Sequence, residues 1–525
     1  MGCSTCRISA WLAHPLDKDQ AVAEAWGQPG WADYSGVSRT LSSLSWEEAR
    51  QIVHILDEIS QSYIEAELQL LCSQNRHIRL DGDLTGIPVS NTSQTYPNAT
   101  FGHMDDEIRL GYQAAVVSME SPTYGRMWLS GAHHPGDTVS CTQAEALVLA
   151  AEARTGLRPK RRTDLLQQRI RAFEQQVAET KKRWETQAQA LQKTKERLSE
   201  AEKLEQERQA ELANQEKAYQ ERQRMERPTS RLAQARKRLQ AASSRVRSRQ
   251  KAWKAAQKRL EKTTVCWKKQ MDELAALDQR LKRFEQENTT NAQPIEADFR
   301  LDAGFGIYEN MALLIEMCYE VYTKPHGNQA LAYLKQQVDD QTTWTRVGAN
   351  AELVAWSDLQ FKKCPYRLDV ALERFYTDKT LKHSALFHFG VDPVTEDLPA
   401  WFRKYNGRQT IEAGIKESKQ VFYLHHIKVR SEPAIYLQEC FVLFAANFIR
   451  WASHWLAEHS QPVANALDIR KLGVKRQVQV AAHVSALVIR NSEGKLLKFS
   501  KQSAFAGKIL KVAFDPKSGP QKEKF

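Results

Sequence analysis

Apolar residues recur at every seventh position between residues 161 and 290, and mostly polar residues stand between them. A seven-residue repeat is typical of helices packed as a coiled coil. The segment has no glycine, and the register of the repeat changes near Pro228. The pattern therefore predicts two long helices in an antiparallel hairpin. A continuous dimeric coil is the alternative, but a hairpin returns the chain to its starting point, as an insertion into a folded domain requires.

Two heptad series carry this prediction. The first is interrupted at Glu205 and consists of Ile170, Val177, Trp184, Leu191, Leu198, Leu212 and Tyr219. The second consists of Leu232, Leu239, Val246, Trp253, Leu260, Trp267, Leu274 and Leu281.

On both sides of the hairpin, short apolar runs alternate with polar residues as in β-strands. Before it, we expect strands at 78–85, 112–119 and 126–129 and a helix from Thr142. After it, a strand at 297–302, a helix at 309–316 and a strand at 319–322 form a β-α-β unit. Strands interleaved with helices predict an α/β fold with a mixed sheet.

The last third of the chain is expected to add three features. A small β insertion over residues 326–400 has strands at 344–347, 352–356, 366–375 and 383–389. The apolar stretch Ala434–Leu456 contains charged and amide residues, so it predicts a buried amphipathic helix rather than a membrane span. The basic tail has strand-like runs at 477–480, 485–489 and 508–513, and residues 517–525 are expected to be disordered.

The N-terminal 75 residues are expected to be helical. Ser43–Glu48 has the residue types that start a helix, and Ile52, Ile55, Leu56 and Ile59 continue it with helical spacing. Ala32–Leu41 resembles the recognition helix of a helix-turn-helix, although an ordinary packing helix explains it equally well.

Charge indicates a polyanionic partner. The 525 residues carry a net charge of +12, and residues 231–270 contain 14 basic residues and one acidic residue. A phosphate backbone is the obvious source of counter-charge for such a segment, so we expect the hairpin to contact DNA. The eight cysteines are scattered, and only Cys3 and Cys6 form a C-x-x-C pair, which predicts reduced thiols in a cytosolic protein.

Candidate chemistry lies in residues 405–419. Tyr405, Arg408, Glu412 and Lys419 follow one another at three, four and seven residues, which are the steps of one helical face. The carboxylate suits a metal ion, and the cations suit the phosphates of a phosphodiester. The alternative is a solvated helix with an ordinary Arg-Glu pair.

This spacing resembles the signature of insertion-sequence transposases of the DDE type, and it matches at all four positions. The resemblance implies a ribonuclease-H-like core with three catalytic carboxylates that bind two Mg²⁺ or Mn²⁺ ions: Asp83, near Thr85 on the first strand, Asp302, before the Gly304-Phe305-Gly306 turn, and Glu412. Tyr405, Arg408 and Lys419 would contact DNA. The family also has a β insertion between its second Asp and its Glu.

Several choices stay open from the residues alone. Asp81 and Asp83 point to the same side of a strand, so either is a possible ligand. Asp298 is expected to be exposed. Lys416 is a second possible phosphate contact, and His133-His134 is a weak candidate for a metal-binding pair. Trp344 and Trp356 are candidates for stacking on a flipped base, and packing within the β insertion is the alternative for both.

The predicted organisation has seven segments: a helical DNA-binding region (1–75), three parts of the catalytic core (76–160, 291–325 and 401–458), the basic coiled-coil hairpin (161–290), the β insertion (326–400) and a basic C-terminal region (459–525). The expected function is DNA cleavage at element ends and strand transfer by the freed 3′-hydroxyl. The resemblance implies a homodimer on paired double-stranded DNA ends in a prokaryotic cytoplasm, associated with the nucleoid and not with a membrane. A metal-dependent nuclease or a non-catalytic DNA-binding protein is the alternative.

Overall fold

The computed structural model describes residues 34–459, except 93, 105–106, 224–226, 378–379, 392–393 and 428, and the segments 468–482, 486–491, 494–499 and 509–512. The chain forms two units, of which one is residues 161–290 and the other contains the rest. Predictions for residues 1–33 and for the end of the tail fall outside the described residues.

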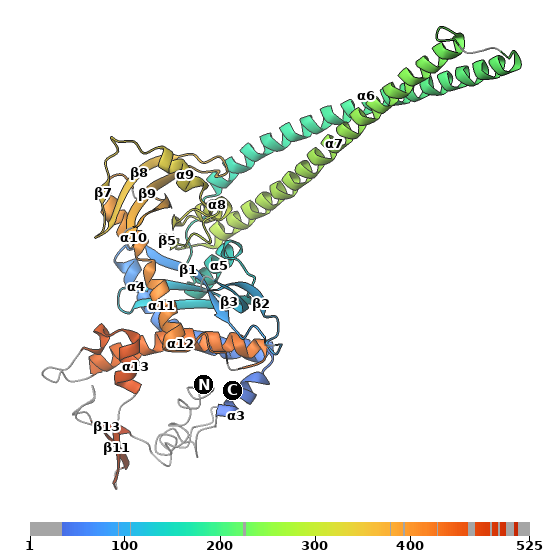
Figure 1. Ribbon diagram of the computed structural model, residues 1–525. Coiled ribbons are helices and arrows are strands. Elements are labelled where there is room, and N and C mark those ends of the chain that lie inside the picture. The colour runs from blue at the N-terminus through green and yellow to red at the C-terminus, as the bar shows by residue number, and fades with distance from the viewer. Residues whose placement is uncertain are drawn as a thin grey trace. The chain divides into compact units, whose positions relative to one another are not determined.

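A mixed β-sheet organises the larger unit (Figure 1). In the described part of the chain it has ten strands, in the order β2-β3-β1-β5-β6-β10-β9-β8-β7, and β4 also pairs with β3. β3 is antiparallel to β1 and β4, whereas β1, β5 and β6 are parallel to one another. The predicted α/β class with a mixed sheet is therefore confirmed.

The strands are bounded as follows: β1 Ile78–Pro88, β2 Thr100–Met104, β3 Glu107–Ser121, β4 Gly125–Pro135, β5 Ala297–Arg300, β6 Glu320–Thr323, β7 Thr345–Arg346, β8 Ala351–Leu359, β9 Leu368–Thr377 and β10 Thr380–Phe389. The four strands of the predicted β insertion all form, and β10 is hydrogen-bonded to β6, so they extend the same sheet. A helix that the sequence did not predict, α9 (Gln329–Gln336), precedes them.

Helices pack against the sheet and carry the core. α5 (Ala144–Thr155) packs on β3 and β4, and α8 (Tyr308–Glu316) joins β5 to β6. α12 (Glu432–His459), the predicted apolar helix, packs on β4 and on α4 (Trp46–Ser73). None of the described helices is long and apolar enough to cross a membrane.

The ends of the larger unit differ in how they agree with the sequence predictions. α3 (Tyr34–Ser42) forms within the predicted recognition-helix segment, but it also contacts α12. β11 (Ala486–Asn491), β12 (Gly494–Phe499) and β13 (Ile509–Val512) form a small sheet near two of the predicted strands. The strand predicted at 477–480 is wrong: α13 (Val474–Ala482) occupies it, because Val474 and Gln477 are buried at a helical spacing. The six cysteines within the described residues are free thiols.

The hairpin unit consists of α6 (Thr163–Glu221) and α7 (Arg231–Thr290), which pack along each other. Polar contacts at the seam fix the register. The Trp184 indole donates to Thr264 Oγ1 at 2.9 Å, and its ring centroid lies 5.3 Å from that of Trp267. Glu205, which interrupts the heptad series, accepts a hydrogen bond from Ser243 of the facing helix. The interruption is thus a specific cross-helix contact that favours one pairing of the two helices.

Ser45 begins α4 with a capping box, as the sequence predicted. Its hydroxyl accepts from the Glu48 backbone N–H at 3.2 Å, and Glu48 accepts from the Ser45 backbone N–H at 2.8 Å. Two amides that the helix itself leaves without partners are thereby satisfied.

Ser45→Ala is expected to lower the free energy of unfolding by about 1 kcal/mol, because the Glu48 amide loses its acceptor. Urea denaturation of the full chain measures the change. Ser43→Ala is the matched control, since the Ser43 hydroxyl bonds only the Thr40 carbonyl in the turn before the helix. Equal losses in the two variants would contradict a role of the cap.

Candidate catalytic site

β1 and β5 bring Asp83 and Asp302 to the same edge of the sheet. The two strands are parallel, and Asp81 stands opposite Arg300 in their register. Asp83 and Asp302 each lie two residues further along, toward the carboxyl ends of the strands. Asp302 lies two residues after Arg300, the last residue of β5, and its Oδ1 accepts a hydrogen bond from the Gly304 amide at 2.9 Å. The carboxyl ends of parallel strands are where α/β folds place their ligands.

α11 (Gln409–Gln420) brings Glu412 to this edge. Ile411 and Ile415 are buried in one cluster with Trp128 and Val116. Val116 stands opposite Asp83 in the β1–β3 ladder, so both side chains point to the same face of the sheet. Glu412 follows the buried Ile411, and it lines one cavity together with Asp83.

Gly414 allows α11 to come this close. A Cβ at Gly414 would lie 2.8 Å from an atom of the Trp128 ring, which is closer than side-chain contacts permit. The sequence alone does not predict this role, because it does not show what packs against a glycine within a helix.

The guanidinium of Arg408 lies among the carboxylates. Its Nη1 is 3.7 Å from Asp83 Oδ2, and its Nη2 forms an ion pair with Glu412 Oε1. Burial lowers the pKa of Arg408, but the charges of Asp83, Tyr405, Glu412 and Asp302 outweigh this and raise it overall. Arg408 is therefore the counter-charge of the acidic group.

The charges of Asp302 and Glu412 both act on Asp83. Burial raises the pKa of Asp83 to about 7; the charge of Arg408 opposes the rise, and those of Asp302 and Glu412 add to it. The oxygens of the three do not all lie within 4.8 Å of one another, since among the described residues only His77, Asp298 and Glu320 form such a group. A hard divalent ion such as Mg²⁺ would offset the repulsion among the three carboxylates. Binding of the ion requires Arg408 to move away from them.

A cavity of about 510 Å³ opens beside Asp83 and Glu412. Lys416 and Lys419 of α11 line it, as does Arg109 of β3, whose guanidinium also pairs with Glu107 at 2.7 Å. The cavity thus combines two of the carboxylates with three cationic side chains. Arg109 was not predicted, because it lies far from the other site residues in sequence and in no recognisable motif.

Tyr405 is not on one continuous helix with Glu412, so the predicted single helical face is wrong at its start. α10 (Leu398–Asn406) ends at Gly407, and α11 begins after Arg408. The Lys404 carbonyl, which a continuous helix would pair with the Arg408 amide, instead accepts from Arg300 Nη1 at 2.8 Å. Tyr405 is buried, which raises the pKa of its hydroxyl, and the neighbouring Arg408 opposes this rise.

Asp81 has partners of its own. It is fully buried and accepts from Arg300 Nε at 2.6 Å and Nη2 at 2.9 Å, while Arg126 lies 3.6 Å away. Two guanidinium groups already neutralise it. Asp83, which lines the cavity, is therefore the better ligand of the two.

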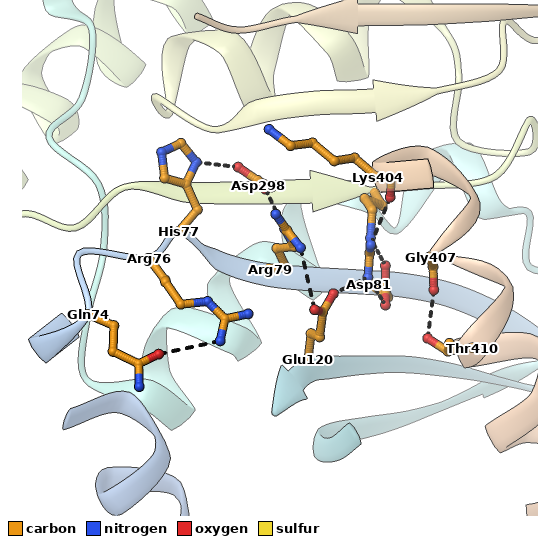
Figure 2. A network of polar contacts seen from close by, with 11 residues as sticks. Gln74, Arg76, His77, Arg79, Asp81, Glu120, Asp298, Lys404, Gly407 and Thr410 are labelled. Carbon is orange, nitrogen blue, oxygen red and sulfur yellow. Dashed lines mark hydrogen bonds and ion pairs between the residues drawn. The ribbon is translucent and has the colours of Figure 1, made fainter. Parts of the chain in front are cut away.

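A chain of charges continues along this face toward the other end of the strands (Figure 2). Arg300 also reaches Glu120, Glu120 pairs with Arg79, and Arg79 donates to Asp298 at 3.1 Å. Asp298 is 2% exposed, so the prediction that it is exposed is wrong: the arginine makes its burial possible.

The remaining candidates have structural partners. His133 Nδ1 lies 2.8 Å from Glu439 Oε1 of α12, both side chains are buried, and no metal group that includes His133 or His134 occurs in the described part of the chain. The Arg374 guanidinium lies 4.1 Å from the ring centroid of Trp344, which favours packing for this tryptophan. Trp356 lies in β8, where it is paired with Val370 of β9.

Comparison of the chain with models of protein families and with curated proteins finds no match to either.

Proposed function

We propose that the protein is a DNA transposase that cleaves strands at element ends and joins the freed 3′-hydroxyl to a new strand. The observation that carries this proposal is the meeting of Asp83, Asp302 and Glu412 around Arg408, beside a cavity lined by cations. Carboxylates suit metal ions, and cations suit a nucleic-acid backbone. A metal-dependent nuclease without strand transfer is the second candidate, because the same site would serve it.

The sheet supports a ribonuclease-H-like core. Strands β4, β3, β1, β5 and β6 lie in this order, with β3 antiparallel to β1 and with β1, β5 and β6 parallel. Three antiparallel strands, a helix and two further parallel strands form the arrangement expected of such a core. The hairpin enters the chain between α5 and β5, so the order of the strands is unaffected.

The side chains divide the work. Asp83, Asp302 and Glu412 would hold one or two Mg²⁺ ions, which lower the pKa of the attacking water or hydroxyl and stabilise the leaving oxygen. Arg408, once released from the carboxylates, offers two parallel N–H donors to a phosphate, whereas Lys416 and Lys419 act as point charges. Tyr405 is buried against Arg408 and positions it, rather than contacting DNA directly.

The basic stretch of α7 supports DNA as the partner. Arg236 and Arg238 pair with Glu216 and Glu211 of α6, but most of the other basic side chains of residues 231–270 are exposed. Exposed cations along one helix can follow a phosphate backbone. We also propose a homodimer on paired DNA ends and a nucleoid location, as the transposase assignment implies.

Replacing Lys251, Lys254 and Lys258 of α7 by Gln is expected to weaken DNA binding and to reduce the slope of log affinity against log salt by roughly 3. Fluorescence anisotropy with labelled duplex across a salt series measures both. The control removes the same charge from α6, where acidic neighbours are frequent, by replacing Lys181, Lys182 and Lys195. Equal effects of the two triple variants would contradict a dedicated DNA surface on α7.

The reaction products test the proposed function. The purified protein is incubated with the DNA segment that encodes it and its flanks, a target plasmid and Mg²⁺. Breaks at the segment ends together with joined products support the transposase. Breaks without joining would favour the nuclease, and binding without breaks in Mg²⁺ or Mn²⁺ would overturn both in favour of a DNA-binding protein.

A further inference from the structure

Three metal-ligand side chains lie together at the amino ends of β1, β5 and β6, away from the carboxyl ends that carry Asp83 and Asp302. His77 immediately precedes β1, Asp298 is the second residue of β5, and Glu320 is the first residue of β6. In the parallel register, Asp298 stands opposite both Arg79 and Glu320. One ligand atom of each residue lies within 4.8 Å of the other two, so this group could hold a metal ion.

The two carboxylates are well buried. Asp298 is 2% exposed and Glu320 is 6% exposed. His77 Nδ1 lies 2.6 Å from Asp298 Oδ1, while the other oxygen of Asp298 accepts from Arg79 at 3.1 Å. His77 and Arg79 thus supply counter-charge to Asp298 (Figure 2), whereas Glu320 forms no such ion pair within the described part of the chain.

Only one carboxylate oxygen of Glu320 accepts a hydrogen bond within the described part of the chain. Its Oε1 accepts from the Val391 amide at 3.1 Å, but Oε2 is buried without a hydrogen-bond partner among the described residues. Such a buried acceptor costs stability unless something binds it.

Gly390 keeps the space beside this oxygen open. A Cβ at Gly390 would lie 2.9 Å from Glu320 Oε2 and 2.7 Å from His388 Nε2. The His388 ring is 1% exposed, and Nε2 too has no hydrogen-bond partner among the described residues. Two buried polar atoms without a hydrogen-bond partner among the described residues, Glu320 Oε2 and His388 Nε2, therefore lie beside Gly390.

We propose that His77, Asp298 and Glu320 bind one divalent transition-metal ion of the zinc class, which ties β1, β5 and β6 together. An imidazole nitrogen with two carboxylates favours such an ion over Mg²⁺, which prefers oxygen ligands alone. Asp302 lies four positions after Asp298, roughly 13 Å along an extended chain, so the ion is distinct from any at the catalytic site. Its role is structural, and it does not depend on the proposed function.

Zinc binding to the full chain tests the proposal without DNA or activity. Protein stripped with a chelator is titrated with Zn²⁺ by calorimetry, and its thermal unfolding is followed with and without the ion. One equivalent is expected to bind and to raise Tm. His77→Gln should weaken binding at least about 100-fold and abolish the shift in Tm. His77→Cys, which restores a donor, should recover both.

Three controls make the result decisive. His54→Gln removes an exposed histidine paired with Glu58 and should leave the affinity unchanged. Glu412→Gln should also leave it unchanged, which separates this ion from one at the catalytic carboxylates. A cooperative thermal transition of stripped His77→Gln shows that the variant folds; its Tm is expected to lie below that of stripped wild type, because Asp298 loses the counter-charge of His77. No saturable zinc binding, or equal binding by His77→Gln, would overturn the proposal and leave a buried ion-paired cluster.

Discussion

Glu412→Gln is expected to reduce strand cleavage at least about 1000-fold while DNA affinity is kept or increases. The amide fills the same space on α11 but removes a charge that a metal ion requires. Glu412 is 54% exposed at its side chain, so the substitution leaves no buried polar group without a partner. Loss of activity without loss of binding therefore reports on chemistry and not on folding.

The structure supplies a matched control for this result. Glu396 is an exposed carboxylate in the segment that leads to α10, and Glu396→Gln changes net charge by the same amount. Cleavage by that variant should equal that of the wild type, measured on the same labelled duplex in Mg²⁺. Asp83→Asn and Asp302→Asn should behave as Glu412→Gln does. Cleavage by Glu412→Gln within a few fold of the wild-type rate would exclude Glu412 from the site.

Arg408 forms ion pairs with two of the three candidate carboxylates, Asp83 and Glu412, and the sequence predicts only one of these pairs. The motif separates Arg408 and Glu412 by four residues, and this spacing alone predicts their ion pair. That the same guanidinium also reaches Asp83 depends on how α11 packs over β1, through Ile411, Ile415 and Gly414. Tertiary packing of this kind has no signature in local spacing.

The helix break at Gly407 was missed for a related reason. Residues 405–419 have helical spacing throughout, and a glycine inside such a pattern is tolerated. The cause lies on β5: Arg300 takes the Lys404 carbonyl, and a Cβ at Gly407 would lie 2.4 Å from Arg300 Nη1. A contact more than 100 residues away in sequence thus decides a local feature.

The buried ion pairs between β1 and β5 have a signal in the sequence. In β1 and β5, charged residues occupy alternate positions of otherwise apolar strands: Arg79, Asp81 and Asp83 in one, Asp298, Arg300 and Asp302 after the hairpin. Alternation places each set on one face. Two facing sets of opposite charges predict buried pairs between neighbouring strands, and the structure shows them as Asp81–Arg300 and Arg79–Asp298. By contrast, the heptad repeats alone predict the two long helices of the hairpin, because a coiled coil is specified by local repeats.

Arg300→Met is expected to lower the free energy of unfolding by about 3–5 kcal/mol. The guanidinium is 2% exposed and donates to both oxygens of Asp81, which is itself fully buried. Methionine fills much of the volume but leaves that carboxylate with only Arg126, at 3.6 Å. The Lys404 carbonyl also loses its donor. Urea denaturation measures the loss in the free energy of unfolding. Hydrogen exchange in peptides from β1 and β5 shows whether these two strands lose protection.

Two further variants identify the cause of that loss. If the uncompensated charge of Asp81 is responsible, the double variant Asp81→Asn/Arg300→Met should be more stable than Arg300→Met alone, because an amide is cheaper to bury than a carboxylate. Arg367→Met breaks an ion pair with Asp358 whose side chains are 60% and 69% exposed, and it should cost less than about 1 kcal/mol. A loss of stability in Arg300→Met as small as that in Arg367→Met would mean that water or a shifted Arg126 compensates the charge of Asp81. The buried ion pair would then not be what holds β1 to β5 beneath the candidate carboxylates Asp83 and Asp302.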